Sequence, residues 1–318
     1  MDLQLGMCFD RTFPPAFVLE VAERLESDGV DQLWVIEDCF YTAGISLAAA
    51  ALARTERLTV GLGILPATAR NPAITAMEIA TLARLAPGRV LAGIGHGVQD
   101  WMDQMGARTP SPVTTLNEVI TVVRRLLHGD TITFDGRHVT MRDVALDQPP
   151  ELVPPVLAGV RGPKSLAMAG RVADGLVLAE GTGPTYVRQA VGQAGDPQPF
   201  RVSVFTIVCI TEDPRDAYRT MAPFVGDLCA SPTPNVRAHP HFGDIQDRWR
   251  DRAEEGLVDM PAEWWGQLGA IGTFDDAVAH VQALHDAGVN DVSLFPAAEV
   301  DVARRQMDDV VRLATALR

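Results

Sequence analysis

The sequence predicts an α/β fold, a (β/α)8 TIM barrel with insertions, and two observations favour it. Eight apolar, strand-like segments mostly alternate with helical segments along 318 residues. Two consecutive strands, in the stretch Leu58–Gly97, also end in unusual glycine-rich backbone. The rival is a doubly wound open sheet, but no clear GxGxxG fingerprint follows the first strand. We therefore expect a single domain over residues 1–318.

The expected strands are short and apolar, and most of them precede a helix. They are Leu3–Phe9, Gln32–Glu37, Leu58–Leu65, Arg89–Gly95, Pro154–Ala158, Gly175–Ala179, Phe200–Ile210 and Asp291–Phe295. Helices are expected where apolar residues recur at helical spacing or where capping residues mark the ends. They are 14–27, Gly44–Ala53, Ala73–Leu85, Thr114–Leu127, 163–171, a helix from Pro184, Asp213–Leu228, Thr273–Ala287 and Val300–Leu317.

Three segments depart from this alternation and are expected to be insertions. Residues 131–144 alternate in polarity around Asp135-Gly136, which is typical of a β-hairpin. Residues 102–112 and 229–265 show little periodicity, although part of the latter, near 245–255, is expected to be helical. Long irregular segments in compact domains are more often functional than idle. We expect these two segments to select the substrate, or else to pack against the barrel or a second subunit.

Charge and cysteine content argue against several classes of partner. A net charge of −14 and a pI near 4.9 disfavour nucleic acid and anionic membrane surfaces. The four cysteines form no metal-ligand pattern, no apolar run reaches membrane-spanning length, and no signal peptide opens the chain. We therefore expect a cytoplasmic protein with free thiols and no bound metal.

Polar side chains that follow the second and fourth strands are candidates for catalysis. Glu37, Asp38 and Tyr41 follow the second strand, and His96 stands in a Gly-His-Gly turn after the fourth. A carboxylate at such a strand end can act as acid or base, whereas the structural alternative is helix capping or pairing with an arginine. Cys39 is interpreted as a buried small residue rather than a nucleophile, because nothing in the sequence lowers the pKa of its thiol.

The turn after the fifth strand has the composition of an anion site. Gly159-Val160-Arg161-Gly162-Pro163 leads from the strand into a helix, whose first N–H groups attract anions. Arg161 adds a guanidinium that suits a phosphate. The alternative is an ordinary strand–helix turn with proline at the first helical position.

Together these motifs resemble the luciferase-like monooxygenase superfamily of flavin and deazaflavin enzymes. The segments that carry the resemblance cover roughly residues 3–180: Leu33–Asp38, Val60–Pro66 with Arg70-Asn71-Pro72, Pro87–Arg89 leading to Gly93–Gly97, Pro155–Gly159 with Arg161-Gly162-Pro163, and Ala173–Gly175. The resemblance implies a TIM barrel that binds its cofactor at the C-terminal ends of the strands. It implies a bulge with a non-prolyl cis peptide at Gly63-Ile64 behind the flavin ring. It also implies cofactor contacts from Gly95, His96 and Gly97, and from a phosphate-binding turn at Val160–Pro163 with Gly159.

The branch of this superfamily most similar to the chain uses coenzyme F420. The resemblance therefore implies an oxidoreductase that passes a hydride between F420 and a small organic substrate, with Glu37, Asp38 and His96 as candidate catalytic residues. An FMN-dependent monooxygenase is the alternative, and a non-catalytic flavin-binding protein on the same barrel is a third reading. The resemblance also implies a homodimer.

The chain departs from the family pattern at two places. Many deazaflavin members have Asp-His at the end of the second strand, where this chain has Asp38-Cys39. The histidine that would stabilise substrate or cofactor is therefore missing. Sugar-phosphate dehydrogenases of the family carry a glutamate soon after the fourth-strand turn, where this chain has Val98-Gln99. Sugar phosphates are consequently disfavoured as substrates.

Overall fold

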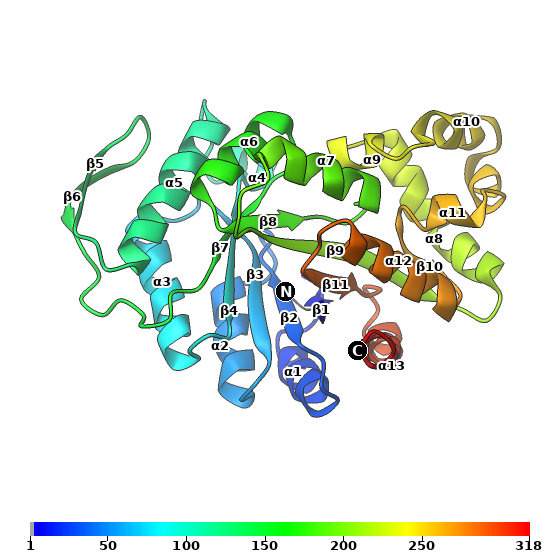
Figure 1. The fold of residues 1–318 in the computed structure, drawn as a ribbon, viewed down its shortest axis with the longest axis horizontal. Coiled ribbons are helices and arrows are strands. Elements are labelled where there is room, and N and C mark those ends of the chain that lie inside the picture. The colour runs from blue at the N-terminus through cyan, green and yellow to red at the C-terminus, as the bar shows by residue number, and fades with distance from the viewer. Residues whose placement is uncertain (1–2) are drawn as a thin grey trace. The chain divides into compact units, whose positions relative to one another are not determined.

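The computed structural model describes residues 3–318, and the chain divides into two compact units. The central unit comprises Phe9–Val177 and 194–201, and the terminal unit comprises the chain up to Cys8 together with 178–193 and 202–318. Each unit contains parallel strands and the helices that connect them (Figure 1). That both units belong to one domain stays a prediction.

The central unit contains parallel strands in the order β2-β3-β4-β7-β8. Their bounds are β2 Gln32–Ile36, β3 Thr59–Pro66, β4 Val90–Gly95, β7 Val156–Gly159 and β8 Gly175–Leu178. These strands are almost entirely buried, as expected of a parallel sheet. The helices of this unit are α1 Phe17–Ser27, α2 Gly44–Arg54, α3 Pro72–Leu85, α4 Gln99–Gln104, α5 Pro112–Leu127 and α6 Pro163–Val172.

The predicted hairpin at 131–144 is confirmed. Strands β5 (Ile132–Asp135) and β6 (Thr140–Val144) pair antiparallel, and Figure 1 shows them extending beyond α5. The Glu118 carboxylate on α5 accepts hydrogen bonds of 2.7–2.9 Å from the backbone N–H groups of residues 137–139. This carboxylate fastens the turn of the hairpin to the helix.

The terminal unit contains parallel strands in the order β10-β9-β11-β1. Their bounds are β1 Gln4–Phe9, β9 Arg201–Ile210, β10 Gly269–Gly272 and β11 Asp291–Phe295. Asp291 of β11 stands opposite Gln4 of β1 on one side and Ser203 of β9 on the other. The helices are α7 Pro184–Ala194, α8 Pro214–Ala230, α9 Pro234–Arg237, α10 Phe242–Val258, α11 Ala262–Trp265, α12 Phe274–Asp286 and α13 Val300–Ala316.

Every strand expected from the sequence is present, with bounds that differ by at most two residues. Two element predictions need correction. The helix expected from residue 14 begins at Phe17, because residues 14–16 form a turn before it. Strand β10 was missed, because its four residues, GAIG, are too short and too rich in glycine to predict a strand.

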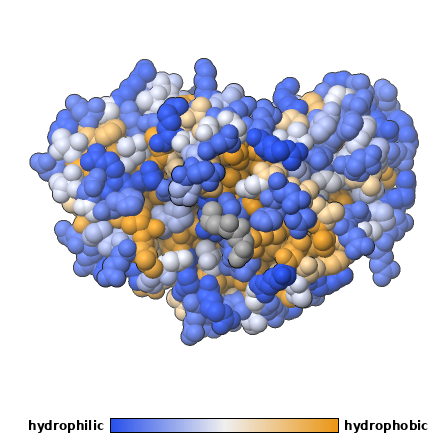
Figure 2. All heavy atoms as spheres, viewed as in Figure 1, coloured by the Kyte–Doolittle hydropathy of each residue, from blue (hydrophilic) through white to orange (hydrophobic). Residues whose placement is uncertain are grey.

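The segment 229–265 is more helical than its sequence predicts, since α9, α10 and α11 occupy most of it. Helix α10 buries only Ile245 and residues 256–258, and Figure 2 shows hydrophilic residues over its outer side. Ala253 interrupts the helix with φ of 48°. The helix predicted near 245–255 is confirmed within α10, which extends further because so few buried positions give little apolar periodicity to mark its ends. Within 102–112, the first residues complete α4 and the rest up to α5 is irregular.

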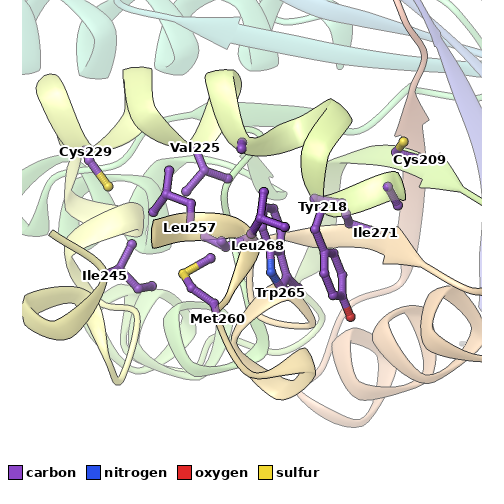
Figure 3. Packing of buried hydrophobic residues seen from close by; sticks show 13 residues of the cluster. Cys209, Tyr218, Val225, Cys229, Ile245, Leu257, Met260, Trp265, Leu268 and Ile271 are labelled. Carbon is purple, nitrogen blue, oxygen red and sulfur yellow. The ribbon is translucent and has the colours of Figure 1, made fainter. Parts of the chain in front are cut away.

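Aromatic packing fixes part of this insertion to the terminal unit. Tyr218 of α8 and Trp265 of α11 stack with ring centroids 4.8 Å apart and an interplanar angle of 2°. Figure 3 shows both rings beside Leu268 and below α8. Both side chains are buried, so Trp265 of the insertion packs within the terminal unit.

Helix α3 carries apolar residues on two faces. Ile79 and Leu82 are buried, whereas Ile74, Met77 and Leu85 are exposed, and Figure 2 shows hydrophobic residues at the surface over this helix. Exposed apolar patches often mark protein contacts. The homodimer stays a prediction that the mass measured by analytical ultracentrifugation tests, and a monomer would contradict it.

A close approach between β2 and β3 gives a stability prediction. A Cβ atom on Gly61 would lie 2.2 Å from Cδ2 of Trp34, a buried ring whose Nε1 donates to Gln32 Oε1 over 2.9 Å. Gly61→Ala is expected to lower the free energy of unfolding by about 1–3 kcal/mol, because the anchored ring must move. Urea denaturation measures the change. Gly192→Ala, at a helical glycine with open space around it, is the control expected to cause no loss.

Candidate functional site

Three predicted cofactor-binding stretches meet at the ends of neighbouring strands in the central unit. Pro66 of β3 stands opposite Gly95 of β4, which stands opposite Gly159 of β7. The register of β3 shifts just before its end, and the Gly63-Ile64 peptide bond within this bulge is cis. The predicted bulge and its cis peptide are therefore confirmed.

The Ile64 side chain explains why glycines surround the bulge. A Cβ atom on Gly93, Gly95 or Gly159 would lie 2.8, 2.2 or 2.5 Å from Ile64 side-chain atoms, respectively. Contacts below 3.0 Å require the neighbour to move, so larger residues at these positions would displace Ile64. The glycines thus allow the isoleucine side chain to lie across the ends of β4 and β7.

His96 connects the β4 turn to the start of α6. Its Nε2 atom lies 3.0 Å from Ser165 Oγ, and the buried Nδ1 atom has no hydrogen-bond partner in the part of the chain that the structure describes. Burial lowers the pKa of His96, so the imidazole is neutral at pH 7. A buried nitrogen without a partner is unusual in a folded protein and fits a group that binds a ligand.

The turn before α6 is open, as an anion site requires. No side chain caps this helix, and a Cβ atom on its N-cap residue, Gly162, would meet nothing within 4 Å. The first N–H groups of a helix have no partner inside the helix, and the helix dipole favours negative charge there. Arg161 is half-buried beside the turn, and Val160 is buried.

Glu37 is held in a network of hydrogen bonds and ion pairs. Arg70 donates to both of its carboxylate oxygens, with a distance of 2.8 Å from Nη2 to Oε2, and the Gly44 N–H at the start of α2 also donates to Oε2 over 2.8 Å. Arg70 Nε lies 3.2 Å from Glu78 Oε2. The Glu37 side chain is only 8% exposed. These contacts fix the loop between β2 and α2.

Asp38 pairs with an arginine that the sequence did not single out. Arg11 Nη1 donates to Asp38 Oδ2 over 2.6 Å. The peptide bond between the two residues that follow Asp38, Cys39 and Phe40, is cis. Burial raises the pKa of the Cys39 thiol, and the carboxylates of Glu37 and Asp38 raise it further. A raised thiol pKa disfavours a nucleophilic role, as expected from the sequence, but Cys39 is half-buried rather than buried as predicted.

Two aromatic rings flank the Arg11 guanidinium. Its Cζ atom lies 4.8 Å from the ring centroid of Tyr41 and 5.8 Å from that of Trp101 on α4. Sequence reasoning missed Arg11 and Trp101. Arg11 stands two residues after β1, so the rule that selected Glu37 and Asp38 at a strand end would also have found it. No local signal in the sequence identifies Trp101, since its contact with Arg11 is long-range.

The remaining expectations concern metals, membranes and cysteines. Within residues 3–318, no three or more His, Cys, Asp or Glu side chains cluster in a way that could hold a metal ion. No helix over the same range has the length and apolar composition needed to cross a membrane. None of the four cysteines of this range forms a disulfide bond.

Comparison with known proteins assigns the chain to a family. The family described as luciferase-like monooxygenase matches residues 4–291. A 5,10-methylenetetrahydromethanopterin reductase from Methanolobus tindarius is 27% identical over 310 residues, which is 91% of this chain and 93% of the relative. An F420-dependent glucose-6-phosphate dehydrogenase from Beutenbergia cavernae is 32% identical over 185 residues, 54% of each chain.

Solved structures share the fold over the full length. An F420-dependent secondary alcohol dehydrogenase in complex with an F420-acetone adduct has a TM-score of 0.79 at 22% identity, covering 100% of both chains. The oxygenating constituent of 3,6-diketocamphane monooxygenase from Pseudomonas putida, in complex with FMN, has a TM-score of 0.70 at 17% identity, covering 98% of this chain and 97% of that one. The fold is the predicted (β/α)8 TIM barrel of the luciferase-like type.

Proposed function

Since the chain belongs to the luciferase-like monooxygenase family, we propose that it is an oxidoreductase that transfers a hydride between coenzyme F420 and a small organic substrate. One observation carries the proposal: the Gly63-Ile64 bulge, the Gly95–Gly97 turn and the Gly159–Pro163 turn meet at adjacent strand ends. F420 is preferred to FMN because the relative from Beutenbergia cavernae, matched by sequence, is named as F420-dependent.

The residues at this end of the central unit fit such a cofactor. The open start of α6 at Gly162, with Arg161 beside it, would hold the phosphate, and the Nδ1 atom of His96 would donate or accept one hydrogen bond to the bound molecule. The Gly63-Ile64 bulge would support the ring system. The bound cofactor supplies a hydride donor or acceptor, which no protein side chain provides.

The three candidate catalytic residues take different roles in this proposal. Glu37 positions the loop after β2, because both of its carboxylate oxygens already accept hydrogen bonds. His96 contacts the cofactor, since it lies beside Ser165 at the start of α6. Asp38 exchanges the proton that accompanies the hydride. Its Oδ2 is held by Arg11, whereas Oδ1 has no hydrogen-bond partner among residues 3–318.

Titration of the purified protein with F420 and, separately, with FMN tests the proposal. We expect F420 to bind with a dissociation constant at least about tenfold lower than that of FMN, or about 1.4 kcal/mol. Asp38→Asn is expected to lower kcat without changing the dissociation constant of F420, because Asp38 acts on the substrate side. Tight binding of FMN without binding of F420 would contradict the choice of cofactor.

Two alternatives follow from specific observations. An FMN-dependent monooxygenase is the second candidate, because an FMN complex shares the fold over nearly the whole chain. It would consume oxygen and need a flavin reductase. A non-catalytic flavin-binding protein is the third, because Cys39 stands where many relatives have a histidine. In that case F420 would bind, but no member of a broad substrate panel would be turned over.

A further inference from the structure

Exposed apolar side chains gather on two loops at the catalytic end of the central unit. Phe40 and Tyr41, on the loop after β2, are 66% and 53% exposed, and Val98, in the turn before α4, is 46% exposed. Arg11 joins the two loops, because its guanidinium contacts the rings of both Tyr41 and Trp101. We call Arg11, Phe40, Tyr41, Val98 and Trp101 the rim cluster.

Both loops that carry the rim cluster are anchored by buried side chains. Met102 on α4 is 1% exposed, accepts a hydrogen bond from Thr68 Oγ1 at 3.1 Å, and would be 3.0 Å from a Cβ atom on Gly97. Helix α4 is therefore anchored at the ends of β3 and β4. The loop after β2 is anchored by the Glu37–Arg70 pair described above. A surface of exposed aromatic rings on anchored loops is suited to bind a ligand rather than to fill the protein core.

The charges around the rim cluster disfavour an anionic ligand. The segments 10–12, 37–43 and 98–105 carry five carboxylates. Three of them pair with an arginine, Glu37 with Arg70, Asp38 with Arg11 and Asp103 with Arg108, so Asp10 and Asp100 supply the excess negative charge. Arg11 is itself bound to Asp38, so its charge is already matched. A carboxylate or phosphate on the ligand would meet like charges, which is a common way to reject a competing substrate.

We propose that the substrate of this enzyme is an uncharged molecule with a planar, conjugated body, which lies against the aromatic rings of the rim cluster. The proposal rests on the proposed function, which places the reaction at this end of the barrel. For an α,β-unsaturated ketone, reduction adds one hydride, supplied by the reduced deazaflavin, and one proton across the C=C bond. The products are the saturated ketone and the oxidised deazaflavin.

Two compounds with the same phenyl-vinyl body test the proposal. Benzalacetone is an uncharged ketone, whereas cinnamate carries a carboxylate at the same end. Calorimetric titration of the full-length protein measures the affinity for each compound without requiring turnover, and steady-state assays with reduced F420 measure kcat and KM. We expect benzalacetone to bind at least about tenfold more tightly than cinnamate, because its body stacks on the rings and it carries no charge.

Substitutions in the rim cluster test whether tighter binding of the uncharged ketone depends on the aromatic rings. Tyr41→Ala and Trp101→Ala are each expected to raise the dissociation constant and the KM for benzalacetone about tenfold, the usual effect of one lost apolar contact in a binding site. Leu19→Ala, at an exposed apolar residue on α1, is the matched control expected to change neither value. Circular dichroism confirms that each variant is folded. Glucose-6-phosphate, which has no planar body, is expected not to bind.

The outcomes of these measurements distinguish failure of the substrate inference from failure of the proposed cofactor. Tighter binding of cinnamate, lost in Arg11→Gln, would overturn the inference and would make Arg11 an anion receptor. Binding of neither compound, or binding that Tyr41→Ala and Trp101→Ala leave unchanged, would also overturn it. If benzalacetone binds through these rings but F420 does not bind, the substrate inference is supported and the proposed cofactor is wrong.

Discussion

Arg70→Ala is expected to lower the free energy of unfolding by about 3–5 kcal/mol, the usual cost of removing one partner from a buried ion pair. The guanidinium contacts the carboxylates of both Glu37 and Glu78, and the side chains of the two glutamates are 8% and 26% exposed. Without Arg70, two negative charges remain close together with reduced access to water. Urea denaturation at pH 7 measures the loss.

The loss caused by Arg70→Ala should also depend on pH. Burial already raises the pKa of Glu78, and Arg70 opposes this effect. Without Arg70, burial and the neighbouring Glu37 carboxylate should hold the folded-state pKa of Glu78 further above its unfolded value, near 4.3. The Glu78 carboxylate then destabilises the fold at high pH, and its protonation relieves this as the pH falls through the folded pKa. The difference between variant and wild type should therefore shrink between about pH 7 and pH 4.

Arg54→Ala is the matched control for Arg70→Ala. Arg54 pairs with Glu23 at the surface of the same unit, and both side chains are about half exposed, at 57% and 46%. Pairs of this kind contribute about 0–1 kcal/mol. If Arg70→Ala costs no more than Arg54→Ala, the network around Glu37 does not hold the loop in the way proposed above.

A second large effect is expected from His280 of α12 in acid. Its Nδ1 lies 2.8 Å from the carbonyl oxygen of Gly266, and its Nε2 lies 2.8 Å from Thr206 Oγ1. A neutral imidazole satisfies both contacts by donating from Nδ1 and accepting at Nε2. Burial lowers the pKa of His280 from 6.5 to about 4. The folded protein therefore resists protonation of this ring.

The sign of the pH effect follows from proton binding. Above pH 6.5 the ring is neutral in both the folded and the unfolded state, so its full contribution to stability is present. Between pH 6.5 and about 4 the unfolded state binds the additional proton, so stability falls as the pH falls. At about 1.4 kcal/mol per pH unit, the loss reaches roughly 3 kcal/mol.

Unfolding by urea from pH 7 to pH 4, on the wild type and on His280→Gln, measures this effect. Glutamine can donate and accept hydrogen bonds but does not titrate in this range. The number of protons taken up on unfolding, which sets the slope of the unfolding free energy against pH, should therefore be about one lower in the variant. Burial also lowers the pKa of His239, and this histidine should keep part of the slope in both proteins. Equal slopes in the two proteins would show that His280 does not contribute.

The parts of the fold that could be predicted from the sequence are those with a local signal. The strands are apolar runs bounded by glycine or proline, and the helix at 274–286 follows Thr273, which forms a capping box with Asp276. The cis peptide at Gly63-Ile64 was predicted through the family resemblance, because no local physical signal requires it.

The parts that could not be predicted depend on contacts between distant residues. Helix α10 packs against α8 along a narrow apolar edge, so its sequence predicts a helix only near 245–255 and not over its full length. Arg11 meets Trp101 only because two loops come together, and the pairing of Arg70 with Glu78 is likewise decided by the fold. The backbone turns of the candidate site were thus predicted from the sequence, whereas the side-chain contacts that bring its loops together were not.

The pairing of β1 with β11 has a consequence for how the protein is made. Gln4 on β1 takes Asp291 on β11 as its neighbour, so β1 pairs with a strand that is synthesised much later. Until Phe295 has been synthesised, β1 lacks this partner and its backbone groups must be satisfied by water or by other contacts. The central unit, by contrast, draws most of its residues from the continuous segment Phe9–Val177. Nascent chains therefore carry β1 without its β11 neighbour until β11 has been made, a state that chaperones recognise and that favours aggregation.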